Sequence, residues 1–172
     1  MFRITTRIAL LLAACTLATV AYAQTAVYAQ LNTSLDSGSA KVNDTVSAKL
    51  RQSIKLADGT KVPGGALLTG HVTAVKDGEN SSISFVFDKL VFEDTTMPIH
   101  VVVRRLDDAP PNAEDTSEDS RNIKKDGKPV SKLHNVDLEA ANNGDSATIA
   151  DKGKSVRLEY HTLLGCMISA GA

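Results

Sequence analysis

The feature that most constrains the fold of this chain is a series of short apolar runs, separated by turn residues, in which apolar and polar residues alternate. Its clearest part is 62–72 (VPGGALLTGHV), where a Pro-Gly-Gly turn leads into an apolar run. Pro fixes its own φ, and Gly allows a bend or a close backbone approach. Strand-like runs lie before this block at 46–54 and after it at 82–92 and 97–105. Repeated turn–strand units predict an antiparallel β domain built from hairpins.

Two local signals add detail to this prediction. Asp58-Gly59 is the strongest short hairpin signal in the chain. In the run at 82–92, the alternation of apolar residues changes phase after Phe87, where Asp88 is followed by three apolar residues within four positions. A change of phase inside one strand is what a β-bulge produces, so we expect a bulge at this point.

The second half of the chain contains three further strand-like segments. Two of these segments, at 133–138 and 147–149, are short. The alternation at 156–168 is the longest in the chain, and it predicts one long final strand that closes the sheet. No segment of useful length after the N-terminal region has the periodicity of a helix. The predicted fold is therefore all-β, a small antiparallel β-barrel or sandwich-like domain of about seven or eight strands.

The first 23 residues have the features of a secretory signal peptide. A basic start is followed by an apolar run at 8–20, and Ala21 and Ala23 form a small-x-small cleavage site. The apolar run is too short to span a bilayer as a helix. We therefore expect cleavage after Ala23, export to the periplasm or beyond, and a single mature β domain at 24–172.

Two other interpretations of the N-terminus stand beside this one. Cleavage after Ala29 fits the same small-x-small rule, but it would remove the start of the first predicted strand. Residues 12–15 (LAAC) match the lipobox of bacterial lipoproteins, in which the cysteine is acylated and becomes the first residue. The apolar residues continue past Cys15. That continuation favours the soluble export signal, and a lipid anchor at Cys15 is the alternative.

The composition excludes several classes of partner. The 172 residues contain 19 Lys and Arg against 20 Asp and Glu, a formal net charge of −1. Loss of the basic N-terminus makes the mature chain slightly more acidic. Such a chain has no electrostatic reason to bind nucleic acid or an anionic membrane, and no other segment is apolar enough to cross a bilayer. We expect no nucleic acid as partner and no transmembrane span in the mature chain.

The composition changes abruptly at 107–130. Acidic residues, Asn, Ser and Pro come first, and four basic residues follow between Arg121 and Lys128. A segment with so few apolar residues cannot offset the entropy lost on ordering. It is therefore predicted to be a flexible surface insertion. Such loops often carry binding function, and a solvated loop without a role is the alternative.

The residue types that usually carry catalysis do not form a recognisable motif. The histidines are His71, His100, His134 and His161. They lack the short spacings of a zinc site. Cys166, alone once Cys15 is removed, has apolar neighbours at alternate positions and is expected to be a buried structural residue. The chain has no phosphate-binding Gly loop and no Gly-x-Ser-x-Gly motif. We predict no catalytic residue, no cofactor and no metal site.

An ordered set of five segments resembles a group of secreted bacterial β-domain proteins that are themselves uncharacterised. The segments are 33–37 (TSLDS), 41–44 (KVND), 62–72, 82–88 (SISFVFD) and 153–158 (GKSVRL). The Pro-x-Gly block is also similar to the C-terminal β-barrel of TrbI-type channel scaffolds of conjugation and type IV secretion, over 46–106. Asn43 stands where the first group usually has Gly, and Gly64 where it usually has Lys. The resemblance implies a type of domain, and it implies no catalytic residues.

These observations together predict an exported, non-enzymatic β domain of the cell envelope. It would act as a structural or binding module that recognises an envelope protein or polymer through strand edges and the segment at 107–128. Two alternatives are a lipid-anchored accessory protein and a hydrolase of envelope polymers with a site built from His100, His161 and nearby acids.

Overall fold

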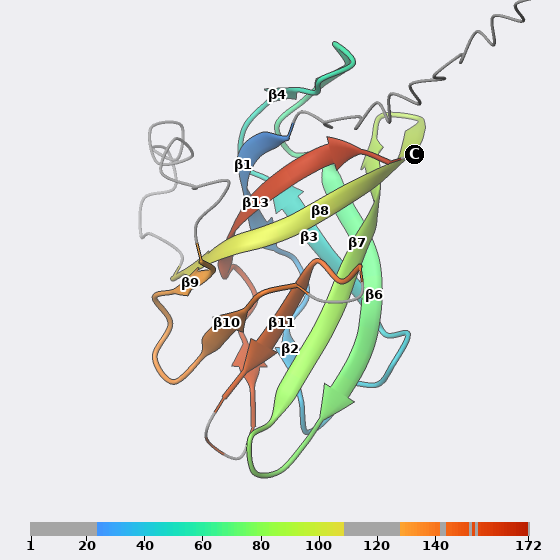
Figure 1. Ribbon diagram of the computed structural model, residues 1–172. Coiled ribbons are helices and arrows are strands. Elements are labelled where there is room, and N and C mark those ends of the chain that lie inside the picture. Colours follow the sequence, from blue (N-terminus) through green and yellow to red (C-terminus); the bar gives the residue numbers. More distant parts are fainter. Residues whose placement is uncertain (1–23, 109–127, 142–143, 152, 154, 172) are drawn as a thin grey trace, which may run out of the picture.

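A computed structural model of the chain describes residues 24–108, 128–141, 144–151, 153 and 155–171 (Figure 1). Every regular element in these ranges is a β-strand, so the predicted all-β class is confirmed. The predicted signal peptide and most of the predicted insertion at 107–130 lie outside the described residues. The described part contains no helix with the length and hydrophobicity that crossing a membrane requires.

The strands differ widely in length, from two residues to thirteen. In chain order they are β1 (Thr25–Leu31), β2 (Leu35–Asp36), β3 (Thr45–Leu50), β4 (Ile54–Lys55), β5 (Lys61–Val62), β6 (Leu67–Lys76), β7 (Ser82–Phe92), β8 (Thr95–Asp107), β9 (Val130–Ser131), β10 (Asp137–Glu139), β11 (Ala147–Ala150), β12 (Arg157–Leu158) and β13 (Leu163–Ala170).

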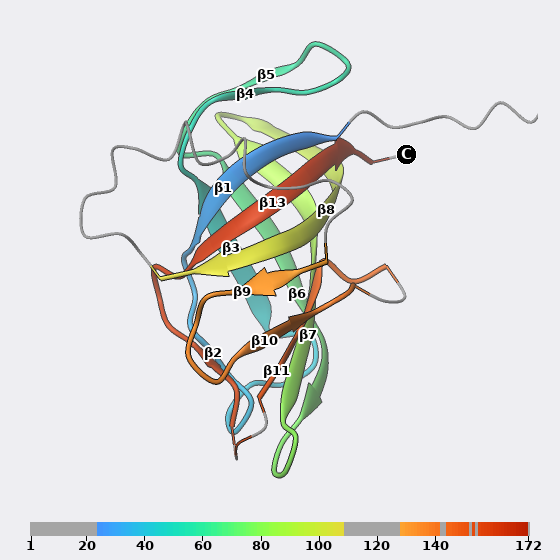
Figure 2. The same ribbon diagram turned by 60° about the vertical axis from the view of Figure 1, so that its left-hand side comes forward.

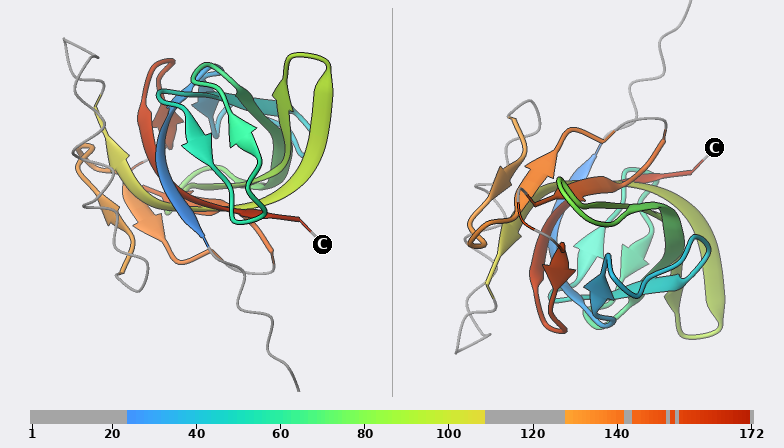
Figure 3. Two further views of the ribbon diagram at one scale, coloured as in Figure 1. Left: turned by 90° about the horizontal axis from the view of Figure 1, so that it is seen from above. Right: turned by 90° about the horizontal axis from the view of Figure 1, so that it is seen from below.

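Six strands close into an antiparallel barrel. Their order is β7-β6-β3-β1-β13-β8, and β8 also pairs with β7, which completes the ring. Figure 2 shows the barrel from the side, and Figure 3 shows it from both ends. In the described residues the main sheet has nine strands. β9 extends it beyond β8 at one end, and β11 followed by β10 extends it beyond β7 at the other. Closure removes the free edges of the six barrel strands, and it decides for a barrel over a sandwich.

The inward-facing residues of these strands form one apolar core. Phe85 and Phe87, which alternate on β7 as predicted, are fully buried and pack edge to face with their ring centroids 5.3 Å apart. The predicted hairpin at Asp58-Gly59 joins β4 to β5 and lies across one end of the barrel (Figure 3). Its Leu56 and Val62 belong to the core, so the hairpin closes that end with apolar side chains.

The Pro-Gly-Gly block forms the corner between β5 and β6, as the sequence predicts. Gly65 has a φ of 90°, and the Ala66 N–H donates to the Pro63 carbonyl at 3.3 Å. This is the geometry of a turn whose third residue must be left-handed, a position that Gly adopts without strain. The corner then turns the chain into β6.

The predicted bulge lies on β7 beside β6. Thr69 pairs with Lys89 whereas Gly70 pairs with Phe87, so Asp88 has no partner residue on β6. At the bulge the two backbones approach very closely. A Cβ on Gly70 would lie 1.7 Å from a carbonyl oxygen of β7, and therefore only glycine fits.

Strands β7 and β8 pair only near the turn that joins them, and then they diverge. β11 pairs with the first part of β7, and β9 pairs in parallel with the end of β8. Buried Ser146 connects β7 and β8 by hydrogen bonds at the point where they diverge. Its N–H donates to the Phe85 carbonyl, its carbonyl accepts from Val103 N–H, and its Oγ accepts from Phe87 N–H, each at 2.8 Å.

The long final strand predicted at 156–168 is wrong. β12 ends at Leu158, β13 begins at Leu163, and a turn lies between them in which His161 has a φ of 77°. β12 pairs with β2, whereas β13 pairs with β1 and β8. Both strands bury alternate residues in the same core, so the alternation continues across a turn that contains no Gly, Pro, Asn or Asp. The strand predicted at 133–138 is also displaced, because 133–136 forms a turn before β10.

Candidate functional site

The two ends of the main sheet lie next to each other. β9 pairs with β8 on one side, and β10 pairs with β11 on one side, and neither pairs with a described strand along its second edge. A short turn joins the two strands, and Figure 2 shows them side by side on the outside of the barrel. An unpaired strand edge presents main-chain N–H and C=O groups to an extended partner chain. We call β9 and β10 together the edge surface.

Two hollows of about 440 Å³ and 310 Å³ flank β10. Asp137 and Asp151 line both of them, and Glu139 lines the smaller one together with Lys76. Asp137 and Glu139 are exposed on either side of buried Leu138, so their side chains share one face of the strand. The edge surface is therefore acidic.

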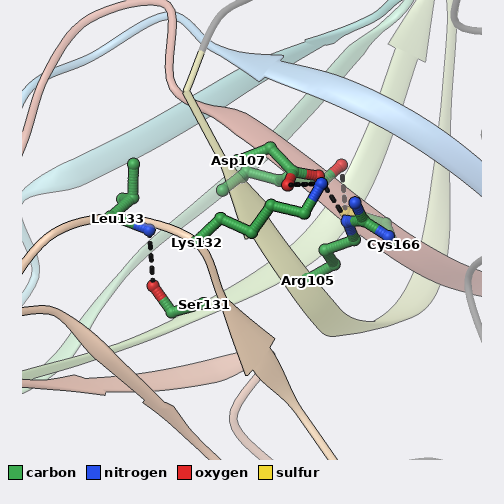
Figure 4. Close-up of polar contacts among 7 residues, drawn as sticks. Arg105, Asp107, Ser131, Lys132, Leu133 and Cys166 are labelled. Atoms are coloured by element: carbon green, nitrogen blue, oxygen red, sulfur yellow. Dashed lines mark hydrogen bonds and ion pairs between the residues drawn. The ribbon is translucent and has the colours of Figure 1, made fainter.

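A compact ion cluster fixes the end of β8 against the end of β9 (Figure 4). Asp107 Oδ2 lies 2.5 Å from Arg105 Nε, and its Oδ1 lies 3.3 Å from Lys132 Nζ. The Asp107 side chain is only 14% exposed, so solvent screens the pair from Arg105 less than it screens a surface pair. The Leu133 N–H also donates to Ser131 Oγ. These contacts hold in place both ends of the chain that continues into 109–127.

The structure does not bring the histidines together. His71 lies on β6 with its Nδ1 3.9 Å from Asp88 Oδ2, and His134 lies in the turn before β10. His100 pairs with Ser169 near the end of β13, whereas His161 precedes the start of that strand. About eight residues of strand, or roughly 26 Å, separate the two. The hydrolase site imagined from His100 and His161 is therefore not assembled, and the described residues contain no group of His, Cys, Asp and Glu suited to a metal.

Cys166 is buried on the inner face of β13, as expected of a structural residue. Burial raises the pKa of its thiol from 9.0 to about 12, because the thiolate would lose its hydration. A neutral thiol is a poor nucleophile. Nothing in this environment activates Cys166.

Several aspartates accept hydrogen bonds from nearby backbone N–H groups. Asp36 Oδ1 accepts from Gly38 N–H, Asp44 Oδ2 from Lys41 N–H, and Asp58 Oδ1 from Thr60 N–H. The hydrogen bonds from Thr60 lower the pKa of Asp58, since they favour the charged carboxylate. These acids shape turns and are not placed for catalysis.

The turn between β12 and β13 places two aromatic rings on the surface. Tyr160 is 53% exposed, and its ring centroid lies 4.0 Å from that of His161. The Tyr160 hydroxyl donates to Asn32 Oδ1 at 3.1 Å, and Gln30 Nε2 donates to the His161 carbonyl at 3.5 Å. The sequence prediction missed this surface, because both rings fell inside the supposed final strand. One signal of a break in this run was present in the sequence: no other predicted strand is long enough to pair with all of 156–168.

The comparisons with known proteins add one likeness. No protein-family profile matches the chain, and no curated protein sequence matches it. Among solved structures, the chain is similar to ComB10 of the Com type IV secretion system of Helicobacter pylori, with a TM-score of 0.43 and 10% identity over 87% of this chain and 86% of that one. ComB10 is a type IV secretion component, the class that the resemblance to TrbI-type scaffolds names. A similarity of this degree says nothing about function.

Proposed function

We propose that this chain is an exported, non-enzymatic β-barrel module of the cell envelope that binds a partner through the edge surface and the segment at 107–128. The observation that carries the proposal is the pair of neighbouring, half-paired strands β9 and β10. The other strands of the main sheet are paired on both sides, so in the described residues its free main-chain groups are concentrated here.

The chemistry of the edge surface suggests the kind of partner. A strand added to β10 would form main-chain hydrogen bonds, which give affinity without reading a particular sequence. The carboxylates of Asp137, Glu139 and Asp151 would favour Lys or Arg side chains on that strand. The partner is therefore an extended basic segment of an envelope protein.

The binding role is tested by capture of partners from native envelope extracts. The double variant Asp137→Lys/Glu139→Lys reverses the charge of β10, and a second variant replaces 109–127 with a short Gly-Ser linker. Both are expected to lose the proteins that the wild type retains. Asp94→Lys, at an exposed position in the β7–β8 turn, is the matched control for the charge change. Retention of the same proteins by both variants would contradict the proposal.

The exported state is tested by the intact mass of the protein purified from its native envelope. A mature chain that begins at Gln24 is the expected result. An acylated chain that begins at Cys15 would instead identify a lipid-anchored accessory protein. An unprocessed chain that begins at Met1 would contradict export.

A further inference from the structure

The turn between β12 and β13 combines two features that folding alone does not explain. Among the described Phe and Tyr residues, Tyr160 is the one with an exposed side chain. The His161 ring lies against it at a tilt of 42°, and His161 has a φ of 77°, in the left-handed region that a residue with a side chain seldom adopts. Uncommon backbone conformations cluster at functional sites, so this turn is a candidate site.

The backbone of this turn would be served better by glycine. The Thr162 N–H and its Oγ1 both bond to the Glu159 carbonyl, at 3.2 Å and 2.8 Å, so His161 is the third residue of a β-turn. A turn with positive φ at the third position favours Gly or Asn. A ring at this position therefore adds surface that the turn itself does not require.

The groups around the rings are amides and paired charges. Asn32 accepts from the Tyr160 hydroxyl, and its side-chain NH₂ supplies two donors in addition. Gln30 bonds the His161 carbonyl and also accepts from Arg51 Nη1 at 2.9 Å. Arg157 and Glu159, the charged residues beside the turn in sequence, pair with each other at 2.8 Å. The surface thus offers aromatic faces and hydrogen-bonding groups with little net charge.

An extended peptide has little main chain to pair with at this place. β13 is paired with β1 and β8, and β1 with β13 and β3, so neither has a free edge beside the turn. β12 pairs with β2 alone, but it is only two residues long, too short a template for an added strand. A ligand must therefore be recognised by the rings and the amides. A sugar ring fits this description, because its C–H groups form a flat apolar face that packs on an aromatic ring, while its hydroxyl or acetamido groups bond to side-chain amides.

We propose that Tyr160 and His161 form a shallow stacking platform for a sugar ring of a neutral polysaccharide, with Asn32 as its hydrogen-bonding partner. This inference rests on the proposed role of the chain as an envelope binding module, and it adds a glycan as a second ligand. The platform is separate from the edge surface, since it lies in the turn before β13 and includes no residue of β9 or β10.

The test is a titration of the isotope-labelled protein with hexasaccharides of β-linked N-acetylglucosamine and of β-linked glucose, followed by backbone amide shifts. Shifts confined to the turn and to Asn32 are expected with at least one sugar, with dissociation constants of about a millimolar. Tyr160→Ala and His161→Gly should each weaken binding about tenfold, whereas Tyr160→Phe, which keeps the ring, should weaken it only about threefold. Val42→Ala, at another exposed apolar position, should leave it unchanged.

His161→Gly keeps the test independent of misfolding, because this variant relieves the turn while it removes the ring. Absence of shifts with both sugars at about ten times the expected dissociation constant would overturn the proposal. So would binding that the Tyr160 and His161 variants leave unchanged, or shifts of the same residues by a polyproline peptide alone. If neither sugar binds but envelope proteins are still captured through β10, only the sugar platform is contradicted. If capture fails and sugar binding persists, the proposed role of the edge surface is contradicted instead.

Discussion

Two turns in the described residues compare directly, because each places a residue with positive φ at its third position but uses a different side chain. The turn at 63–66 uses Gly65, with a φ of 90°, and leads into β6. The turn at 159–162 uses His161, with a φ of 77°, and leads into β13. The backbone requirement is similar at both places, so the difference in side chain must come from their surroundings.

The surroundings of the two turns explain part of this difference. A Cβ on Gly64 would lie 3.3 Å from the backbone of Gln52, and one on Gly65 would lie 3.2 Å from Lys49 Cε. The first turn is therefore a packed corner with little room for side chains. The second is open to solvent and accommodates two rings. Close contact with the backbone favours glycine at Gly64, and positive φ favours it at Gly65. Positive φ favours glycine at the second turn too, yet the chain has histidine there.

The largest expected effect is at the glycine that follows the first turn on β6. Gly70→Ala would place a Cβ 1.7 Å from a backbone oxygen of β7, so the strands must separate at the bulge. We expect the free energy of unfolding to fall by roughly 3 kcal/mol or more, measured by urea denaturation. Gly38→Ala is the control, because Gly38, like Gly70, has no positive φ, and a Cβ there would meet only the side chain of Asp36, at 3.3 Å. Equal losses in the two variants would show that close approach at Gly70 is not the cause.

A smaller loss is expected at the packed corner itself. Gly65→Ala would force alanine into the left-handed region and press it against the flexible end of Lys49. The Lys49 side chain can move, so the cost is mainly backbone strain, about 1–2 kcal/mol of unfolding free energy. Urea denaturation of the single variant measures it. A neutral result would mean that the corner at 63–66 is less constrained than the comparison implies.

The sign of the effect reverses at the second turn. His161→Gly removes the strain of a side chain at positive φ, partly offset by the greater freedom of glycine in the unfolded chain. We expect the free energy of unfolding to stay unchanged or to rise by up to about 1 kcal/mol. A loss of more than this amount would show that the His161 ring stabilises the fold, and the contrast between the two turns would then disappear.

The smallest expected effect is on the rate at which the Cys166 thiol is labelled, which reports whether β13 separates from its neighbouring strands. Its pKa is about 12 in the folded chain, above the unfolded value near 9, so the stability linked to the neutral thiol is complete below pH 9 and is lost as pH rises toward 12. Labelling with a thiol reagent at neutral pH, in a chain with Cys15→Ser, should be slow in the wild type and in His161→Gly. It should be faster in Gly70→Ala. Rapid labelling of the wild type would contradict the burial of Cys166 on β13.

Local signals predicted the parts of the fold that local chemistry controls. The bulge at Asp88 follows from a change of phase within one strand, and the corner at Gly65 follows from a Pro-Gly pair. The joint at Ser146 had no such signal, because a buried serine that bonds two diverging strands looks like any polar residue in a loop. The edge surface was predicted only as strand edges in general, since β10 was placed several residues too early and its acids were not singled out.

Alternation and turn chemistry act over a few residues, so the pattern of the chain was enough to predict an all-β fold, the positions of its main hairpins and the burial of Cys166. Tertiary structure alone decided that the sheet closes into a six-stranded barrel and that β9 and β10 end side by side. It also divided the last apolar run at His161. The break arises because β12 pairs with β2 whereas β13 pairs with β1 and β8. Those partner strands lie far away in the sequence.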